Sequence, residues 1–83
     1  MLNNNSINVP RGAKIIDIQD RYNYQTNHYP GAVNIPYDEL MNNYKVYLNK
    51  YDTYYIYCKS GKLSKRVTMV LSYLGYKVFM LDN

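Results

Sequence analysis

Among its 83 residues the sequence has one cysteine, one histidine and no tryptophan. One cysteine cannot close an internal disulfide, so we expect a reducing compartment, the cytoplasm. One cysteine and one histidine also fall short of the usual ligand count of a zinc site, so we expect no metal. Residues 19–22, which follow the first expected strand, lack a glycine-rich nucleotide fingerprint, and we expect no cofactor.

Long apolar runs are also missing. No stretch of about 18 apolar residues occurs, so no segment is expected to span a membrane. The amino terminus, Met1 to Ser6, lacks a basic region followed by an apolar one, and we do not expect a secretory signal. The residues that are present, 47% hydrophobic and 19% charged, have the balance of one small globular domain.

The net charge of +4 is concentrated near the cysteine. Four of the ten basic residues fall within eight positions after Cys58, namely Lys59, Lys62, Lys65 and Arg66. A positive patch around one thiol suits a thiolate and small anions better than a phosphate backbone. No nucleic-acid-binding motif accompanies the charge, so we expect no nucleic-acid partner. The twelve tyrosines lie mostly in apolar-periodic segments, where they are expected to be core and boundary residues.

The hydrophobic periodicity predicts four strands that alternate with three helices. The strands are expected at residues 13–18, 32–34, 54–57 and 77–81, and the helices from Asp20, from Tyr37 and from about Ser64. Gly75 is expected to close the last helix in a left-handed conformation. This order predicts an α/β fold with a small open parallel sheet, right-handed crossovers and helices on both faces.

Cys58 is expected at the carboxyl end of a buried strand, directly before a loop and a helix. Ligands of open parallel sheets bind at this edge, and the free N–H groups of a curled loop or helix start favour an anion. Gly61 permits a tight curl, and Ser64 is a natural helix N-cap whose hydroxyl, like that of Ser60, can donate inward. These groups and the neighbouring lysines would lower the pKa of the thiol. The alternative is a buried and inert cysteine.

Three segments resemble one known family. The segment from Cys58 to Ser64, CKSGKLS, is similar to the active-site loop of rhodanese domains, C-[RK]-x-G-x-R-S. Residues 15–19, IIDIQ, resemble the family's I-I-D-V-R strand, and residues 28–36, HYPGAVNIP, resemble its H-I-P-G-A-I-N-I-P segment. The order and spacing of these blocks agree from about residue 13 to residue 81.

The resemblance implies a rhodanese-like domain at residues 13–83, after an extension at residues 1–12 that is partly disordered or an edge strand. It implies a sulfurtransferase in which Cys58 takes sulfur from thiosulfate or a persulfide and gives it to a thiol or cyanide. Asp17 would support the pocket by holding loops, or would simply cap its strand, and His28 would be structural. The substrate-binding cradle would comprise Lys59, Ser60, Gly61, Lys62, Leu63 and Ser64.

The sequence departs from the family pattern at Leu63 and Gln19, where arginine is common. Loss of the first arginine should weaken binding of the thiosulfate dianion, and Lys62 would compensate only in part. The sequence also stops before the family's usual closing helix, so one flank of the core would be thinner, or filled by a partner protein or second subunit. A weakly active or inactive binding or regulatory module is therefore the alternative.

A third hypothesis keeps the rhodanese-like fold but assigns it phosphatase chemistry. Rhodanese-like relatives among the phosphatases and arsenate reductases use a longer loop, C-x5-R, whose arginine clamps a tetrahedral oxyanion. Here Ser64 stands at the sixth position after Cys58. Phosphatase activity is therefore not expected.

Overall fold

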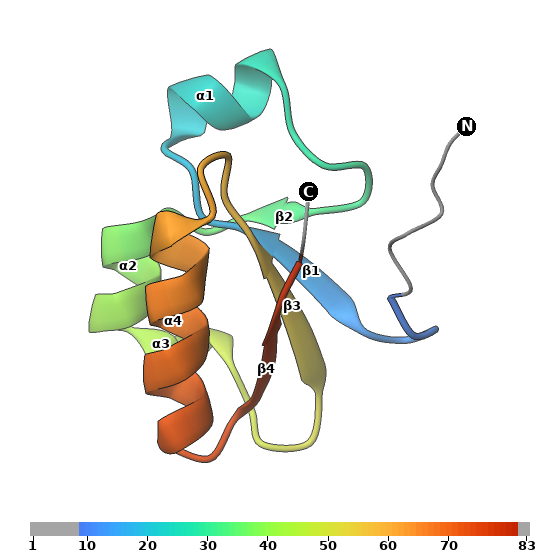
Figure 1. Cartoon of the computed structure of the whole chain (residues 1–83), viewed down its shortest axis with the longest axis vertical. Coiled ribbons are helices and arrows are strands. Elements are labelled where there is room, and N and C mark those ends of the chain that lie inside the picture. Colours follow the sequence, from blue (N-terminus) through green and yellow to red (C-terminus); the bar gives the residue numbers. More distant parts are fainter. Residues whose placement is uncertain (1–8, 82–83) are drawn as a thin grey trace.

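The computed structural model describes residues 9–81, and residues 1–8 of the expected extension 1–12 lie outside the described part. Strands and helices alternate along the chain, as the hydrophobic periodicity predicts (Figure 1). In order they are β1 (Lys14–Asp17), α1 (Arg21–Thr26), β2 (Val33–Asn34), α2 (Tyr37–Asn42), α3 (Tyr44–Tyr47), β3 (Thr53–Tyr57), α4 (Lys62–Tyr73) and β4 (Lys77–Met80).

The four strands form one parallel sheet in the order β2-β1-β3-β4. The central pair is in register from Lys14 opposite Tyr54 to Asp17 opposite Tyr57. All strands therefore end at the same edge of the sheet, and the residues that follow them gather there. The predicted α/β class and small open parallel sheet are confirmed.

The core lies between the sheet and the helices α2 and α4. Ile56 of β3, Leu40 of α2, and Val67 and Leu71 of α4 are fully buried. The helices α2, α3 and α4 lie together along one side of the sheet, and α1, which has no buried residue, lies beyond the carboxyl ends of the strands (Figure 1). Within residues 9–81 the helical cover is thus concentrated on one face, whereas the sequence led us to expect helices on both.

Two helices differ from their expected bounds. The helix predicted from Tyr37 is two short helices, because Asn43 leaves the helical conformation between them. The last helix begins at Lys62, two residues before its predicted start at Ser64. Its end is as predicted: Gly75 has a φ of 99°, and the N–H of Tyr76 donates to the carbonyl of Leu71, which closes the helix in a Schellman motif. No helix among the described residues is long and apolar enough to cross a membrane.

The packing of α4 on the sheet should carry much of the stability. Leu71→Ala removes a fully buried side chain and leaves a cavity, so we expect a loss of about 2–5 kcal/mol in the free energy of unfolding. Val46→Ala, at a side chain that is 81% exposed, should cost about 0.5 kcal/mol or less. Urea unfolding of both variants measures the difference. Equal losses would show that α4 does not anchor the core.

Candidate active site

Cys58 follows directly after β3, where the chain curls back before α4 starts. Gly61 has a φ of 83°, a left-handed conformation that suits glycine and reverses the chain. The curl places the start of α4 against the end of the strand. Because Cys58 lies in the core layer and is only 6% exposed, its sulfur sits at the base of the loop.

Two backbone N–H groups point at the sulfur. The N–H groups of Gly61 and Ser64 donate to the Sγ of Cys58 over 3.1 Å and 3.3 Å. Burial raises the pKa of this thiol, but hydrogen bonds from Ser64, Gly61 and Ser60 outweigh that effect, and the pKa is lowered from its ordinary value. The hydrogen bonds of the loop therefore favour the thiolate form of Cys58.

Ser64, in the first turn of α4, contacts the loop with its buried side chain. It is 1% exposed, and its hydroxyl lies 3.1 Å from the Gly61 carbonyl while also contacting the sulfur. The prediction that Ser64 is the N-cap of the helix was wrong, because Gly61 takes that position. Ser64 lies in the first turn of the helix, where a backbone N–H has no partner within the helix. Its N–H donates to the sulfur of Cys58 instead of to the side chain of an N-cap residue.

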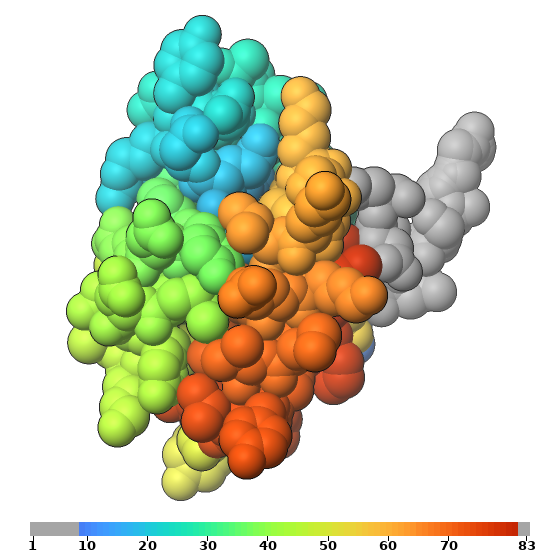
Figure 2. Space-filling model, turned by 60° about the vertical axis from the view of Figure 1, so that its left-hand side comes forward, coloured from blue at the N-terminus to red at the C-terminus, as the bar shows by residue number. Residues whose placement is uncertain are grey.

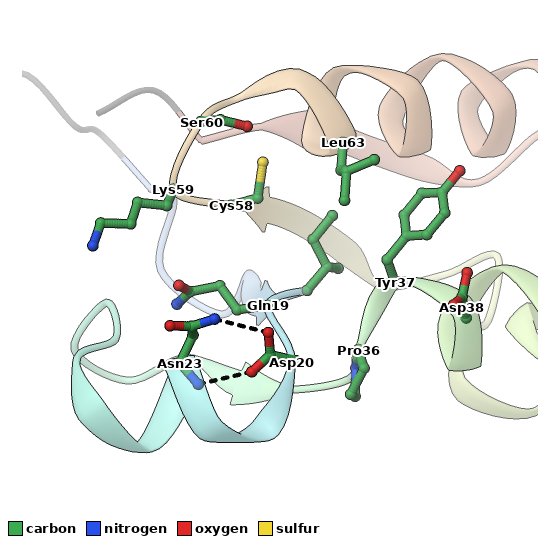
Figure 3. Close-up of a pocket in the computed structure, with 11 residues that line it drawn as sticks. Gln19, Asp20, Asn23, Pro36, Tyr37, Asp38, Cys58, Lys59, Ser60 and Leu63 are labelled. Atoms are coloured by element: carbon green, nitrogen blue, oxygen red, sulfur yellow. Dashed lines mark hydrogen bonds between the residues drawn. The ribbon is translucent and has the colours of Figure 1, made fainter.

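A pocket of about 460 Å³ opens beside the sulfur (Figure 3). Its walls come from the loop after β1, the start of α2 and the loop before α4. In Figure 3 the side chain of Leu63 points into the pocket near Cys58, and Tyr37 stands on the α2 side. The residues that line it are Ile18, Gln19, Asp20, Asn23, Pro36, Tyr37, Asp38, Cys58, Lys59, Ser60 and Leu63.

The charges around this pocket are mixed. Asp20 and Asp38 contribute carboxylates to the lining, and Lys59 is the one cation among the described residues that line it. The side chain of Lys59 points away from the sulfur (Figure 3). Lys62 is not part of the lining; its backbone N–H donates to the hydroxyl of Ser60, and its side chain belongs to a different hollow. The expected contribution of lysine charge to the thiolate is therefore replaced largely by backbone and serine hydrogen bonds.

Asp17 lies behind the pocket and holds its wall. It is fully buried, and its carboxylate accepts hydrogen bonds from the backbone N–H and the side-chain amide of Gln19, both over 2.9 Å. The amide of Asn34 donates to the carbonyls of Asp17 and Gln19. This network ties the ends of β1 and β2 together and fixes Gln19 at the pocket. Asp17 itself does not line the pocket.

His28 lies away from the sulfur. Its ring stacks on Tyr24 with 4.0 Å between centroids, and its Nδ1 is 2.8 Å from the Tyr24 carbonyl oxygen. It does not line the pocket of Cys58, so the structure builds no Cys–His pair. Among the described residues, no group of three side chains of the metal-binding types lies together.

Several residues that line the pocket of Cys58 are not among those predicted from the sequence. Pro36, Tyr37 and Asp38 follow β2, and Asp20 and Asn23 follow β1. Their position directly after predicted strands could have indicated them, because the carboxyl ends of parallel strands share one edge and the residues after them line any site there.

The hydrogen bonds to the sulfur give a testable pH dependence. Alkylation of Cys58 should follow the thiolate, so its rate should fall as the pH drops through a midpoint that lies below the ordinary value of a cysteine thiol. Ser64→Ala removes the hydroxyl contact and should move this midpoint upward. Ser72→Ala, in the same helix but with its hydroxyl bonded to the Val78 carbonyl, is the control and should not move it. An unshifted midpoint in the Ser64 variant would contradict this account of the pKa.

The amino-acid sequence matches the family model of the rhodanese-like domain over residues 2–83. It is 39% identical over 72 residues to a tRNA sulfurtransferase of Pyrobaculum aerophilum, covering 87% of this chain and 15% of that protein. It is 36% identical over 62 residues to the thiosulfate sulfurtransferase PspE of Escherichia coli, covering 74% of this chain and 60% of that protein. The chain thus spans a minor part of the first relative and about three-fifths of the second.

A solved structure described as a rhodanese with anions from E. coli superposes with a TM-score of 0.69. It is 32% identical, and the match covers 82% of this chain and 81% of that chain. The parallel sheet, the cysteine loop and the family match agree with one another, and the chain belongs to the rhodanese-like domain family.

Proposed function

We propose that this domain carries sulfane sulfur on Cys58 and passes it to an acceptor thiol or to cyanide. The observation that supports this most directly is the pair of backbone N–H groups, from Gly61 and Ser64, that converge on the Sγ of Cys58. Such donors stabilise a thiolate and a persulfide anion formed on it. The sulfurtransferase names of two relatives support the same reaction class.

The chemistry needs no group beyond the thiolate and its hydrogen-bond donors. With thiosulfate as donor, the thiolate of Cys58 attacks the outer sulfur, and sulfite leaves with the electron pair of the broken S–S bond. The product is a persulfide on Cys58. An acceptor thiolate then attacks the outer sulfur of this persulfide, and the Cys58 thiolate leaves with the electron pair.

The pocket favours a donor with little negative charge. Asp20 and Asp38 are in its lining, and Leu63 stands where family members often place arginine. A thiosulfate dianion would meet two carboxylates without a bidentate cation. We therefore propose organic or protein persulfides as the better donors, with thiosulfate used slowly.

Persulfide formation can be measured directly. Incubation with thiosulfate or a low-molecular-weight persulfide should add the mass of one sulfur atom to the protein, and a reducing agent should remove it. Cys58→Ser should gain no sulfur. Because Cys58 is the chain's only cysteine, the site is unambiguous. If no donor adds sulfur to the folded wild type, the domain is a binding or regulatory module rather than a sulfur carrier.

The donor preference can be changed at one position. Leu63→Arg would add a fork of donors at the pocket, and hydrogen bonds to charged groups contribute about 1.5–3 kcal/mol. We therefore expect kcat/KM for thiosulfate to rise about tenfold or more. Val46→Arg adds the same charge at an exposed residue of α3 and should change it little. Equal effects would show that the dianion responds to overall charge and not to the pocket.

A further inference from the structure

The exposed face of α4 carries a basic and apolar strip that begins at the active-site loop. Its residues recur at helical spacing on the face opposite the buried Val67 and Leu71. They line a shallow hollow of about 310 Å³, outside the pocket of Cys58. We call them the α4 strip: Lys62, Lys65, Arg66, Met69 and Val70.

The strip lies within reach of the reacting sulfur. The N–H of Ser64 is 3.3 Å from the Sγ of Cys58, and Met69 follows five residues later in the same helix. Five residues of α-helix rise about 8 Å. Figure 2 shows α4, in orange, forming an open part of the surface beside α2 and α3, with the loop of Cys58 at its upper end. A molecule seated on the strip would therefore extend to the mouth of the pocket.

The side chains of the strip are available for a partner. The ion pairs found within residues 9–81 are Lys14 with Asp52 and Arg21 with Glu39, so none involves the strip. Met69 is 63% exposed and Val70 is 37% exposed. A row of cations beside exposed apolar side chains matches a surface that has an acidic patch and an apolar centre.

We infer that the α4 strip docks an acidic protein whose cysteine exchanges sulfur with Cys58. This inference rests on the proposed sulfur transfer and adds the class of its macromolecular partner. In the transfer, the partner's thiolate attacks the outer sulfur of the Cys58 persulfide, its own persulfide forms, and the electron pair returns to the Cys58 sulfur. The charge on the strip orients the partner, and the chemistry stays at the loop.

A protein fits this arrangement better than a nucleic acid. The α4 strip is basic, but the lining of the neighbouring pocket includes the carboxylates of Asp20 and Asp38. An extended polyanion crossing the site would meet these carboxylates, whereas a compact acidic patch can be confined to α4. Met69 and Val70 offer apolar contact that a phosphate backbone cannot use. They also lack the ring faces on which bases stack.

Transfer to defined peptides tests the inference. Cys58 is first loaded with sulfur, and loading is verified by mass, which tests the proposed function separately. Two cysteine peptides then compete as acceptors, one with about four glutamates placed roughly three to seven residues after the cysteine, the other with glutamines there. An extended peptide covers about 3.3 Å per residue, so these positions reach the strip. We expect the acidic peptide to react about tenfold faster at about 0.01 M salt, with little difference near 1 M.

Matched charge reversals locate the effect. Lys65→Glu with Arg66→Glu should abolish or invert the ratio of the two peptide rates. Lys45→Glu with Lys77→Glu makes the same change in net charge at exposed residues outside the strip, and should leave the ratio near its wild-type value. Using the ratio cancels any effect of the substitutions on Cys58 itself.

Three outcomes would overturn the inference although Cys58 loads normally. They are equal rates for the two peptides, equal effects of the two double variants, and strong competition by bulk transfer RNA that depends on Lys65 and Arg66. The last result would assign the strip to a nucleic acid.

Discussion

The site depends on one constraint: the chain must reverse within a few residues after β3 so that the start of α4 faces the strand's last side chain. Gly61 makes this reversal in a left-handed conformation. The buried Val67 and Leu71 then hold α4 against the sheet. With both ends of the loop packed on the core, the N–H groups of Gly61 and Ser64 face the sulfur. Core packing therefore sets the chemistry of the thiol.

Burial and hydrogen bonding act in opposite directions on Cys58. Burial favours the neutral thiol, and the donors of Ser64, Gly61 and Ser60 favour the thiolate. The groups that lower this pKa are hydrogen-bond donors of the loop and of the first turn of α4. Under the proposed function, such a site would hold one negative charge on sulfur and would bind a dianion weakly, because Leu63, Asp20 and Asp38 are in its wall.

The sequence was sufficient to predict the order of strands and helices and the place of Cys58, because strand-end position, glycine and apolar periodicity are local signals. It was not sufficient for the start of α4. Ser64 is a good N-cap by residue type, but tertiary packing buries it and leaves the cap to Gly61. Nor could it predict that Lys62 faces outward, because residues 62 and 63 were expected to belong to the loop, whereas they form the first turn of α4. The break at Asn43 was likewise not predicted, because the apolar spacing from Tyr37 onward continues through it and indicates one helix.

The facing of α4 has a consequence for the whole site. With its start at Lys62, α4 turns Ser64 and Val67 inward and directs Lys62, Lys65 and Arg66 along the exposed face. The two ends of this arrangement use different physics. In the proposed function, the N–H groups at the N-terminus of α4 would hold a small anion in a buried place, and the charges on its surface would attract an acidic partner. Under that proposal, sulfur chemistry and partner choice would be set by different residues of a single helix.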